Sequence, residues 1–207
     1  MLDHSLAVAC GSLAVALAFW GTAVQYWRIR LRGIDGVSLA TWTLFILMGA
    51  FWITYGVVER SAVIVLGSLL VWPLQAAIVV RLRPWHSLAV VARSVGFAAL
   101  LCVAPTVVWG WSAGVLGTGV AMVLNRTPQI AALVRHRHAG GVSAAMWSIN
   151  VVGAALWVIY YQQARLWAAL ASTGLAGLAS LAIALLTRWR HAQAESSAPV
   201  AVSLAQA

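Results

Sequence analysis

The sequence predicts an all-α membrane protein in which seven transmembrane helices form two parallel three-helix bundles joined by a linker helix. Composition and an internal repeat predict this fold class. The 207 residues are 63% hydrophobic and 8% charged, whereas a soluble domain carries about 25% charged residues. Because the chain lacks enough polar side chains to cover a soluble surface, we expect it to lie in a lipid bilayer.

Seven apolar runs are long enough to cross a bilayer, which takes about 20 helical residues. The first run carries Asp3 and no basic residues before it, so we interpret it as a retained helix rather than a secretory signal. The polar segment after Arg190 is rich in alanine and serine, and we expect it to be disordered. The expected spans are Ser5–Trp27, Leu39–Val58, Ala62–Val80, Ser87–Val108, Ser112–Val134, Ala144–Gln162 and Leu166–Thr187.

The formal net charge of +9 comes from arginines, most of which lie in short segments between apolar runs. This distribution is typical of the positive-inside rule rather than of a nucleic-acid-binding surface, so we expect no nucleic-acid partner. Of the arginines between the expected spans, only Arg60 and Arg165 fall on one side of the membrane, and nine fall on the other side. We therefore predict that the N-terminus is outside and the C-terminus is cytoplasmic. The arginines on the predicted cytoplasmic side are Arg28, Arg30, Arg32, Arg81, Arg83, Arg135, Arg137, Arg188 and Arg190.

An internal repeat aligns residues 36–60 with residues 141–165 at an offset of 105, without a gap and with nine identities. The identities include Trp52 with Trp157 and Tyr55 with Tyr160. Each copy covers three helices, so a single linker helix between the copies makes them parallel. We expect a first repeat over 1–84, a linker over 85–110, a second repeat over 111–190 and a tail over 191–207.

A family resemblance follows from these motifs. The chain resembles the PQ-loop superfamily in a pattern that occurs twice around a linker helix. In the second copy the pattern is Pro128-Gln129 near a helix end, a basic loop, Gly141-Val142-Ser143 and then Trp-x-x-Tyr. Within it, the 3+1+3 form is similar to the SWEET sugar transporters, and each half to the bacterial SemiSWEETs. The resemblance implies a uniporter that carries a small neutral solute by alternating access. It implies a mono- or disaccharide first and an amino acid second, in the plasma (cytoplasmic) membrane of a bacterium.

The resemblance also implies roles for residues at matching positions. A hinge is implied at Gln25, Pro128 and Gln129, where a helical proline removes one backbone hydrogen bond. An extracellular gate is implied at Tyr55 and Tyr160, with Arg60 and Arg165 adjoining it. The tryptophan pair Trp52 and Trp157 is expected to stack on the solute. Two further candidates for solute binding are Ser68 and Thr173, which replace asparagines of the family pattern. In the first repeat, Val24 stands in place of the hinge proline.

Polar residues deep in the spans are functional candidates in their own right, because burying them in a bilayer is costly. Arg126 and Asn150 are the two that we add to the substrate-binding set. Three interpretations of Arg126 stay open: it faces water in a pore, it binds backbone carbonyls freed near Pro128, or it receives an anionic solute. Asn150 is either a substrate ligand or a partner in helix–helix hydrogen bonding.

The four acidic residues all lie outside the deep parts of the spans, so the sequence provides no carboxylate relay for protons. We therefore expect passive transport. The sequence also contains no nucleophile–base pair, metal-ligand cluster or phosphate loop, so we expect neither an enzyme nor a cofactor or metal. A seven-helix chain already contains both halves of a pathway, so a homo-oligomer is allowed but not required. Two alternatives stay open: a PQ-loop transporter of amino acids or organic acids, and a receptor or accessory protein that uses the same fold without transport.

Overall fold

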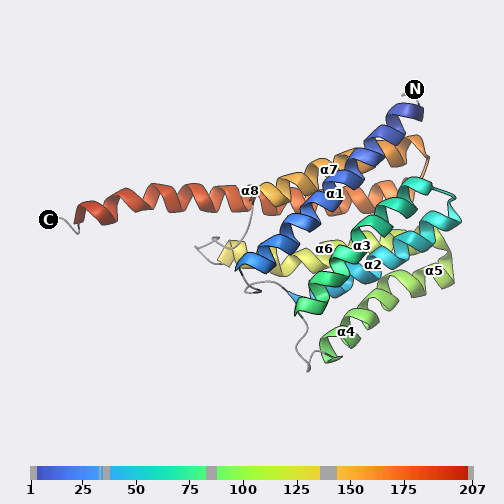
Figure 1. Cartoon of the computed structure of the whole chain (residues 1–207), viewed down its shortest axis with the longest axis horizontal. Coiled ribbons are helices and arrows are strands. Elements are labelled where there is room, and N and C mark those ends of the chain that lie inside the picture. Colours follow the sequence, from blue (N-terminus) through green and yellow to red (C-terminus); the bar gives the residue numbers. More distant parts are fainter. Residues whose placement is uncertain (1–3, 33, 35–37, 83–87, 136–143, 205–207) are drawn as a thin grey trace.

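The computed structural model describes residues 4–32, 34, 38–82, 88–135 and 144–204, and these residues are helical apart from short connections (Figure 1). The helix expected at Leu39–Val58 has those bounds in the structure. The other expected spans differ from the observed helices by a few residues at one or both ends, except the last, whose helix continues well beyond Thr187. The elements in order are α1 (His4–Arg32), α2 (Leu39–Val58), α3 (Ala62–Leu82), α4 (Leu88–Ala98), η1 (Ala99–Val103), α5 (Ala104–Trp109), α6 (Trp111–Arg135), α7 (Ala144–Gln163) and α8 (Trp167–Leu204).

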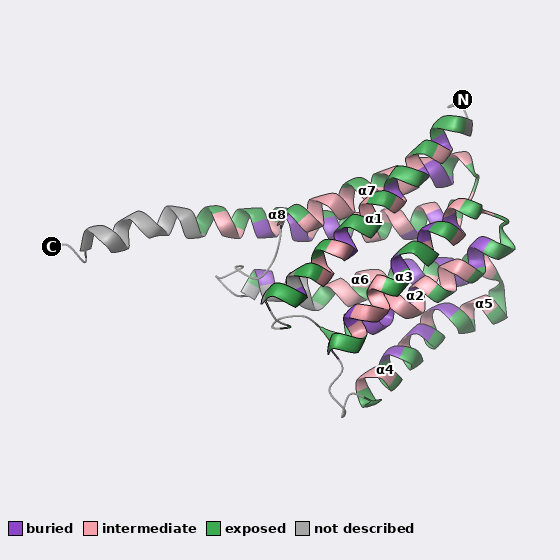
Figure 2. Cartoon of the chain, viewed as in Figure 1, coloured by how far each residue is buried: buried purple, intermediate pink, exposed green. Residues whose placement is uncertain are grey.

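Six helical stretches are long and apolar enough to cross a membrane, and they make this a multi-pass membrane protein. α6 runs beside them over 25 residues and carries Arg126. Large apolar side chains are exposed on the outer faces of the helices, as expected for surfaces that contact lipid (Figure 2). The six stretches are Ser5–Leu31, Leu39–Val58, Ala62–Leu82, Leu88–Trp109, Ala144–Gln163 and Trp167–Gln193.

The helices pack in a pattern that recurs along the chain. α3 contacts both α1 and α2, and α8 contacts both α6 and α7. α1 also packs along α7, so helices from the two sequence repeats lie side by side. Small residues let the backbones of α6 and α8 come close together. A Cβ added at Gly119 of α6 would lie only 2.7 Å from the Ser172 Cα of α8, so a larger residue would not fit there. Close backbone approach of this kind is typical of helix pairs in membranes.

The expected linker is one rod made of α4, η1 and α5, and it packs on α2 and α6. Its middle is the π-helical turn η1, which lies just before Pro105. A proline cannot donate the backbone hydrogen bond that a continuous α-helix needs, so the helix widens at this point. A Cβ at Gly117 of α6 would overlap the carbonyl oxygen of Leu101, which shows how closely α6 approaches this turn. Buried Cys102 also lies in η1, with its Sγ 3.7 Å from the Sδ of Met48.

The turns after α2 and α7 have the same backbone structure, 105 residues apart. Arg60 and Arg165 both have positive φ, at 52° and 58°. In each turn the arginine follows the helix in a Schellman-type cap, a position that glycine usually fills because it has no Cβ. The hydrogen bonds repeat with the same offset: Arg60 N–H to Val57 O at 3.1 Å and Ser61 N–H to Gly56 O at 2.8 Å, then Arg165 N–H to Gln162 O at 3.3 Å and Leu166 N–H to Tyr161 O at 2.9 Å.

α8 differs from its expected end. The segment from residue 191 onward is expected to be disordered from its composition, but α8 continues as a helix to Leu204. The segment contains several alanines, which have the highest helix propensity. Near this point Arg190 of α8 holds the C-terminal end of α6, since its Nε donates to the Leu133 carbonyl at 2.9 Å and its Nη2 to the Val134 carbonyl at 2.7 Å. A cation at this place satisfies carbonyls that a helix end leaves without partners.

Candidate functional site

A cavity of about 780 Å³ lies among helices of both sequence repeats. Its lining comes from α1, α2, α3, α6, α7 and α8, and none of its lining residues belongs to α4, η1 or α5. Pockets that bind small molecules usually measure about 300–1,000 Å³, so the volume suits a small solute. All six predicted substrate-binding residues line this one cavity: Trp52, Ser68, Arg126, Asn150, Trp157 and Thr173.

The two predicted stacking tryptophans are already stacked on a protein side chain. The ring of Tyr161 lies between them, with its centroid 6.0 Å from Trp52 at an interplanar angle of 17° and 5.2 Å from Trp157 at 15°. Tyr161 is buried, at 4% exposure. In this conformation the tryptophan pair therefore cannot hold a solute ring between its two faces.

Each tryptophan also contacts the tyrosine one turn further along its own helix. Trp52 and Tyr55 have centroids 5.6 Å apart at 81°, and Trp157 and Tyr160 have centroids 5.6 Å apart at 80°. The geometry repeats because the two pairs have the same spacing on helices that carry the same repeat. The sequence repeat is thus a repeat of side-chain packing in this part of the chain.

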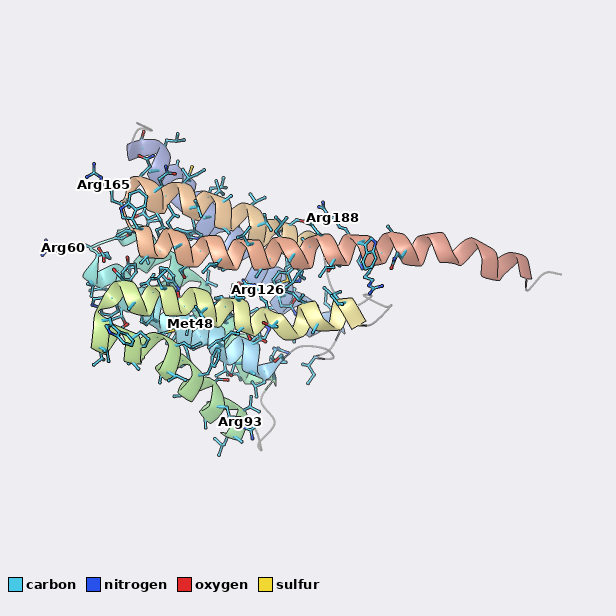
Figure 3. The ribbon with its side chains drawn as sticks, turned by 180° about the vertical axis from the view of Figure 1, so that it is seen from behind. Met48, Arg60, Arg93, Arg126, Arg165 and Arg188 are labelled. Atoms are coloured by element: carbon cyan, nitrogen blue, oxygen red, sulfur yellow. The ribbon has the colours of Figure 1, made fainter. Side chains whose placement is uncertain are left out.

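Of the four predicted gate residues, the structure brings together the two tyrosines but not the two arginines. Tyr55 and Tyr160 are buried in one core cluster with Tyr161. The Tyr160 hydroxyl forms a 2.7 Å hydrogen bond with the Ser61 hydroxyl, which ties α7 to the residue just before α3. Arg60 and Arg165 are exposed, and Figure 3 shows both side chains pointing away from the helices at one end of the molecule.

Arg126 lies on α6, inside the molecule between that end and Arg188 (Figure 3). Its Nη1 donates to the Met122 carbonyl at 3.1 Å, and its guanidinium carbon lies 5.7 Å from the Trp147 ring centroid. Its Nε is buried and has no hydrogen-bond partner. The carbonyl that Pro128 leaves without a helical partner is that of Leu124. The Arg126 Nη1 donates to the Met122 carbonyl instead, one of the carbonyls on the same helix.

The predicted hinge is described only in part. Gln25 lines the cavity from α1. Pro128 and Gln129 lie within α6, which extends to Arg135, but their side chains lie outside the described part of the structure. Just before them, the Thr41 hydroxyl of α2 donates to the Asn125 side-chain oxygen of α6 at 3.2 Å, which joins the two repeats across the cavity lining.

Sequence reasoning missed Tyr161 and the role of Trp111. The ring centroid of Trp111 lies 6.2 Å from that of Tyr55, and Trp111 packs against the same core cluster as Tyr161. The repeat alignment contains a signal for Tyr161, because it pairs this tyrosine with Gly56 beside an otherwise matched Tyr55/Tyr160 pair. A large aromatic residue opposite a glycine marks a place where the two halves pack differently.

Comparisons with protein-family models, with curated proteins and with solved structures find no match to this chain.

Proposed function

We propose that this protein is a facilitative membrane transporter that carries a small solute by alternating access. The observation that carries the proposal is the single cavity lined by all six residues that sequence reasoning selects as substrate ligands. A structural helix bundle would fill this space with apolar side chains, because close packing stabilises membrane helices. Here the lining includes amides and hydroxyls as well as a cation.

The packing of the helices supports a 3+1+3 architecture. The third helix of each repeat lies against the other two, and the α4–η1–α5 rod packs outside the cavity. With the predicted orientation, the Arg60 and Arg165 end faces outward. The aromatic cluster around Tyr161 then closes the outer end of the cavity. The lining extends in the other direction to Ser38 and Ile29, near the connection of α1 with α2. This is the arrangement expected of an inward-facing state of a SWEET-like transporter.

A neutral solute, with a mono- or disaccharide first, is the cargo that the resemblance implies. The lining suits it in part, because tryptophan faces bind the apolar face of a sugar ring and amides bind hydroxyl groups. An organic acid or amino acid is the second candidate. Arg126 favours it, since an arginine in the cavity lining offers a forked donor for a carboxylate.

Transport is tested in liposomes that contain the purified full-length chain, with labelled sugars and amino acids and with or without a pH gradient. We expect saturable uptake that the proton gradient does not accelerate. Trp52→Ala combined with Trp157→Ala should lower uptake at least about tenfold, because it removes both faces and opens the packing around Tyr161. Trp109→Ala is the matched control, as Trp109 is 74% exposed on α5.

Unchanged uptake in the double variant would remove the tryptophans from the transport pathway. Acceleration by a proton gradient would contradict passive transport. Absence of uptake for all solutes, with a folded protein in the liposomes, would favour a receptor or accessory role.

A further inference from the structure

Within the part of the chain that the structure describes, the cavity lining carries one fixed positive charge. Among its lining residues, Arg126 is the sole arginine, and none is aspartate, glutamate or histidine. The two repeats differ at the position of Arg126. In this part of the chain the repeats align at an offset of 104, which pairs Gln129 with Gln25 and Arg126 with Thr22. Thr22 also lines the cavity. The second half thus adds a cation where the first half has a neutral hydroxyl.

The described protein does not neutralise this charge. The only hydrogen bond from the Arg126 guanidinium to the described residues goes to the Met122 carbonyl, and its Nε has no partner. The acidic side chain that the structure describes is Glu59, which caps α2 at the Arg60 end. Arg126 is half-buried, and an arginine inside a membrane protein without an acidic partner among the described residues is unfavourable, which makes it a functional candidate.

The residues near Arg126 supply the rest of a binding site. Trp147, Asn150 and Trp157 occupy one face of α7. Asn150 follows Trp147 by three residues and Trp157 follows Asn150 by seven, which are about one and two helical turns. All three line the cavity, and Arg126 lies over the ring of Trp147. Ten residues of helix separate Trp147 from Trp157, a distance of about 15 Å. A solute held by Arg126 therefore lies beside Trp147 and Asn150, away from the stack that Tyr161 fills.

We infer that the cavity binds a small hydroxylated monocarboxylate, with its carboxylate on Arg126. The fork of an arginine suits a carboxylate, and the amides of Asn150 and Gln25 suit hydroxyl groups. A monoanion fits better than a zwitterion, because the described lining offers no carboxylate for an ammonium group. The inference rests on the proposed transport function and specifies the charge of its cargo.

Binding is tested on the solubilised full-length chain with gluconate, an open-chain hydroxylated monocarboxylate, and with glucose, a neutral ring sugar of similar size. Gluconate at about a hundred times its dissociation constant should raise the midpoint of thermal unfolding by about 5 °C or more. Glucose at the same concentration should shift it by less than half as much. Arg126→Gln should abolish the gluconate shift. Arg93→Gln should keep it, because Arg93 is exposed on α4, outside the cavity lining.

Folding of the variant is checked by its own unfolding midpoint without solute. Arg126→Gln should be at least as stable as the unaltered protein, since it removes a charge that no described acidic side chain neutralises. Arg126→Lys keeps the charge but loses the fork, so it should bind gluconate more weakly than the unaltered protein and more tightly than Arg126→Gln.

Uptake into liposomes separates this inference from the proposed function. Passive transport of a monoanion moves charge, so an inside-positive potential of about 60 mV should accumulate gluconate about tenfold. Glucose uptake should not respond to the potential. Glucose uptake without gluconate binding would overturn the inference and leave the proposed function standing. Gluconate binding through Arg126 without uptake of any solute would overturn the transport function and leave the anion site standing. Gluconate binding that survives Arg126→Gln would overturn the inference.

Discussion

At the scale of single residues, Tyr161 changes the interpretation of the tryptophan pair. Trp52 and Trp157 are expected to face a solute, but in this conformation both stack on Tyr161. The tryptophans therefore belong to the closed end of the cavity in this state. The same cavity is also lined by the polar side chains of Arg126, Asn125 and Asn150. A solute that passes the closed end must displace the Tyr161 ring from the stack.

Substitution of Tyr161 tests this closure. Tyr161→Gly copies Gly56 of the first repeat and removes the middle ring, so we expect an opening through the closed end and a raised passive leak of small polar solutes. Tyr161→Phe keeps the ring and the stack, so its leak should match that of the unaltered protein. Efflux of a trapped sugar from liposomes measures both. An equal leak in Tyr161→Gly and in the unaltered protein would mean that other residues close this end.

At the scale of secondary-structure elements, the turns that end α2 and α7 show the sequence repeat most directly. The same cap and the same positive φ occur at Arg60 and Arg165. The side chains of the two arginines are exposed, and the turn requires only that each backbone adopts a positive φ. Both repeats have an arginine at this position, and there are two explanations for this match. The arginine has a role in the turn, or it binds solute at the gate, and experiment separates the two.

Replacing Arg60 and Arg165 by glycine separates these roles. Glycine adopts positive φ without the Cβ conflict, so each Arg→Gly variant should be more stable by about 0.5–1 kcal/mol, after the entropy that glycine loses on folding. Thermal unfolding in detergent measures the change. Arg→Ala is the matched control, because it removes the same charge and keeps the Cβ, so it should not stabilise. Loss of uptake in both variants at either position would assign that arginine to the gate.

At the scale of the whole molecule, Arg60 and Arg165 share one end, and Arg188 lies toward the other (Figure 3). Arg81 lies in the last turn of α3, which runs away from the turn at Arg60. The positive-inside rule predicts that the end with Arg60 and Arg165 faces outward. The proposed inward-facing state depends on this orientation, because the Tyr161 cluster lies near that end.

Labelling of single cysteines with a membrane-impermeant thiol reagent tests the orientation. In a Cys10→Ala background, Arg60→Cys and Arg165→Cys should react in intact cells. Arg81→Cys and Arg188→Cys should react only after the cells are permeabilised. Cys102 is kept, since it is 1% exposed and serves as the unreactive control. The reverse pattern would place the closed end of the cavity in the cytoplasm and contradict the inward-facing assignment.

The sequence by itself determined the all-α membrane class and the approximate positions of the helices. These follow from apolar run length and from a repeat at constant offset, both of which are local properties of the chain. Helix caps such as Ser38, whose hydroxyl accepts from the Thr41 N–H at 3.3 Å, belong to the same local class.

The tertiary structure decided how these residues divide the cavity. Three features depend on residues far apart in sequence. Tyr161 stacks on both tryptophans, Trp111 packs on Tyr55, and no acidic side chain that the structure describes pairs with Arg126. A repeat alignment matches positions but cannot show which side chain fills the space between two matched ones. That outcome is set by packing between helices, where the difference between Gly56 and Tyr161 makes the two halves pack differently.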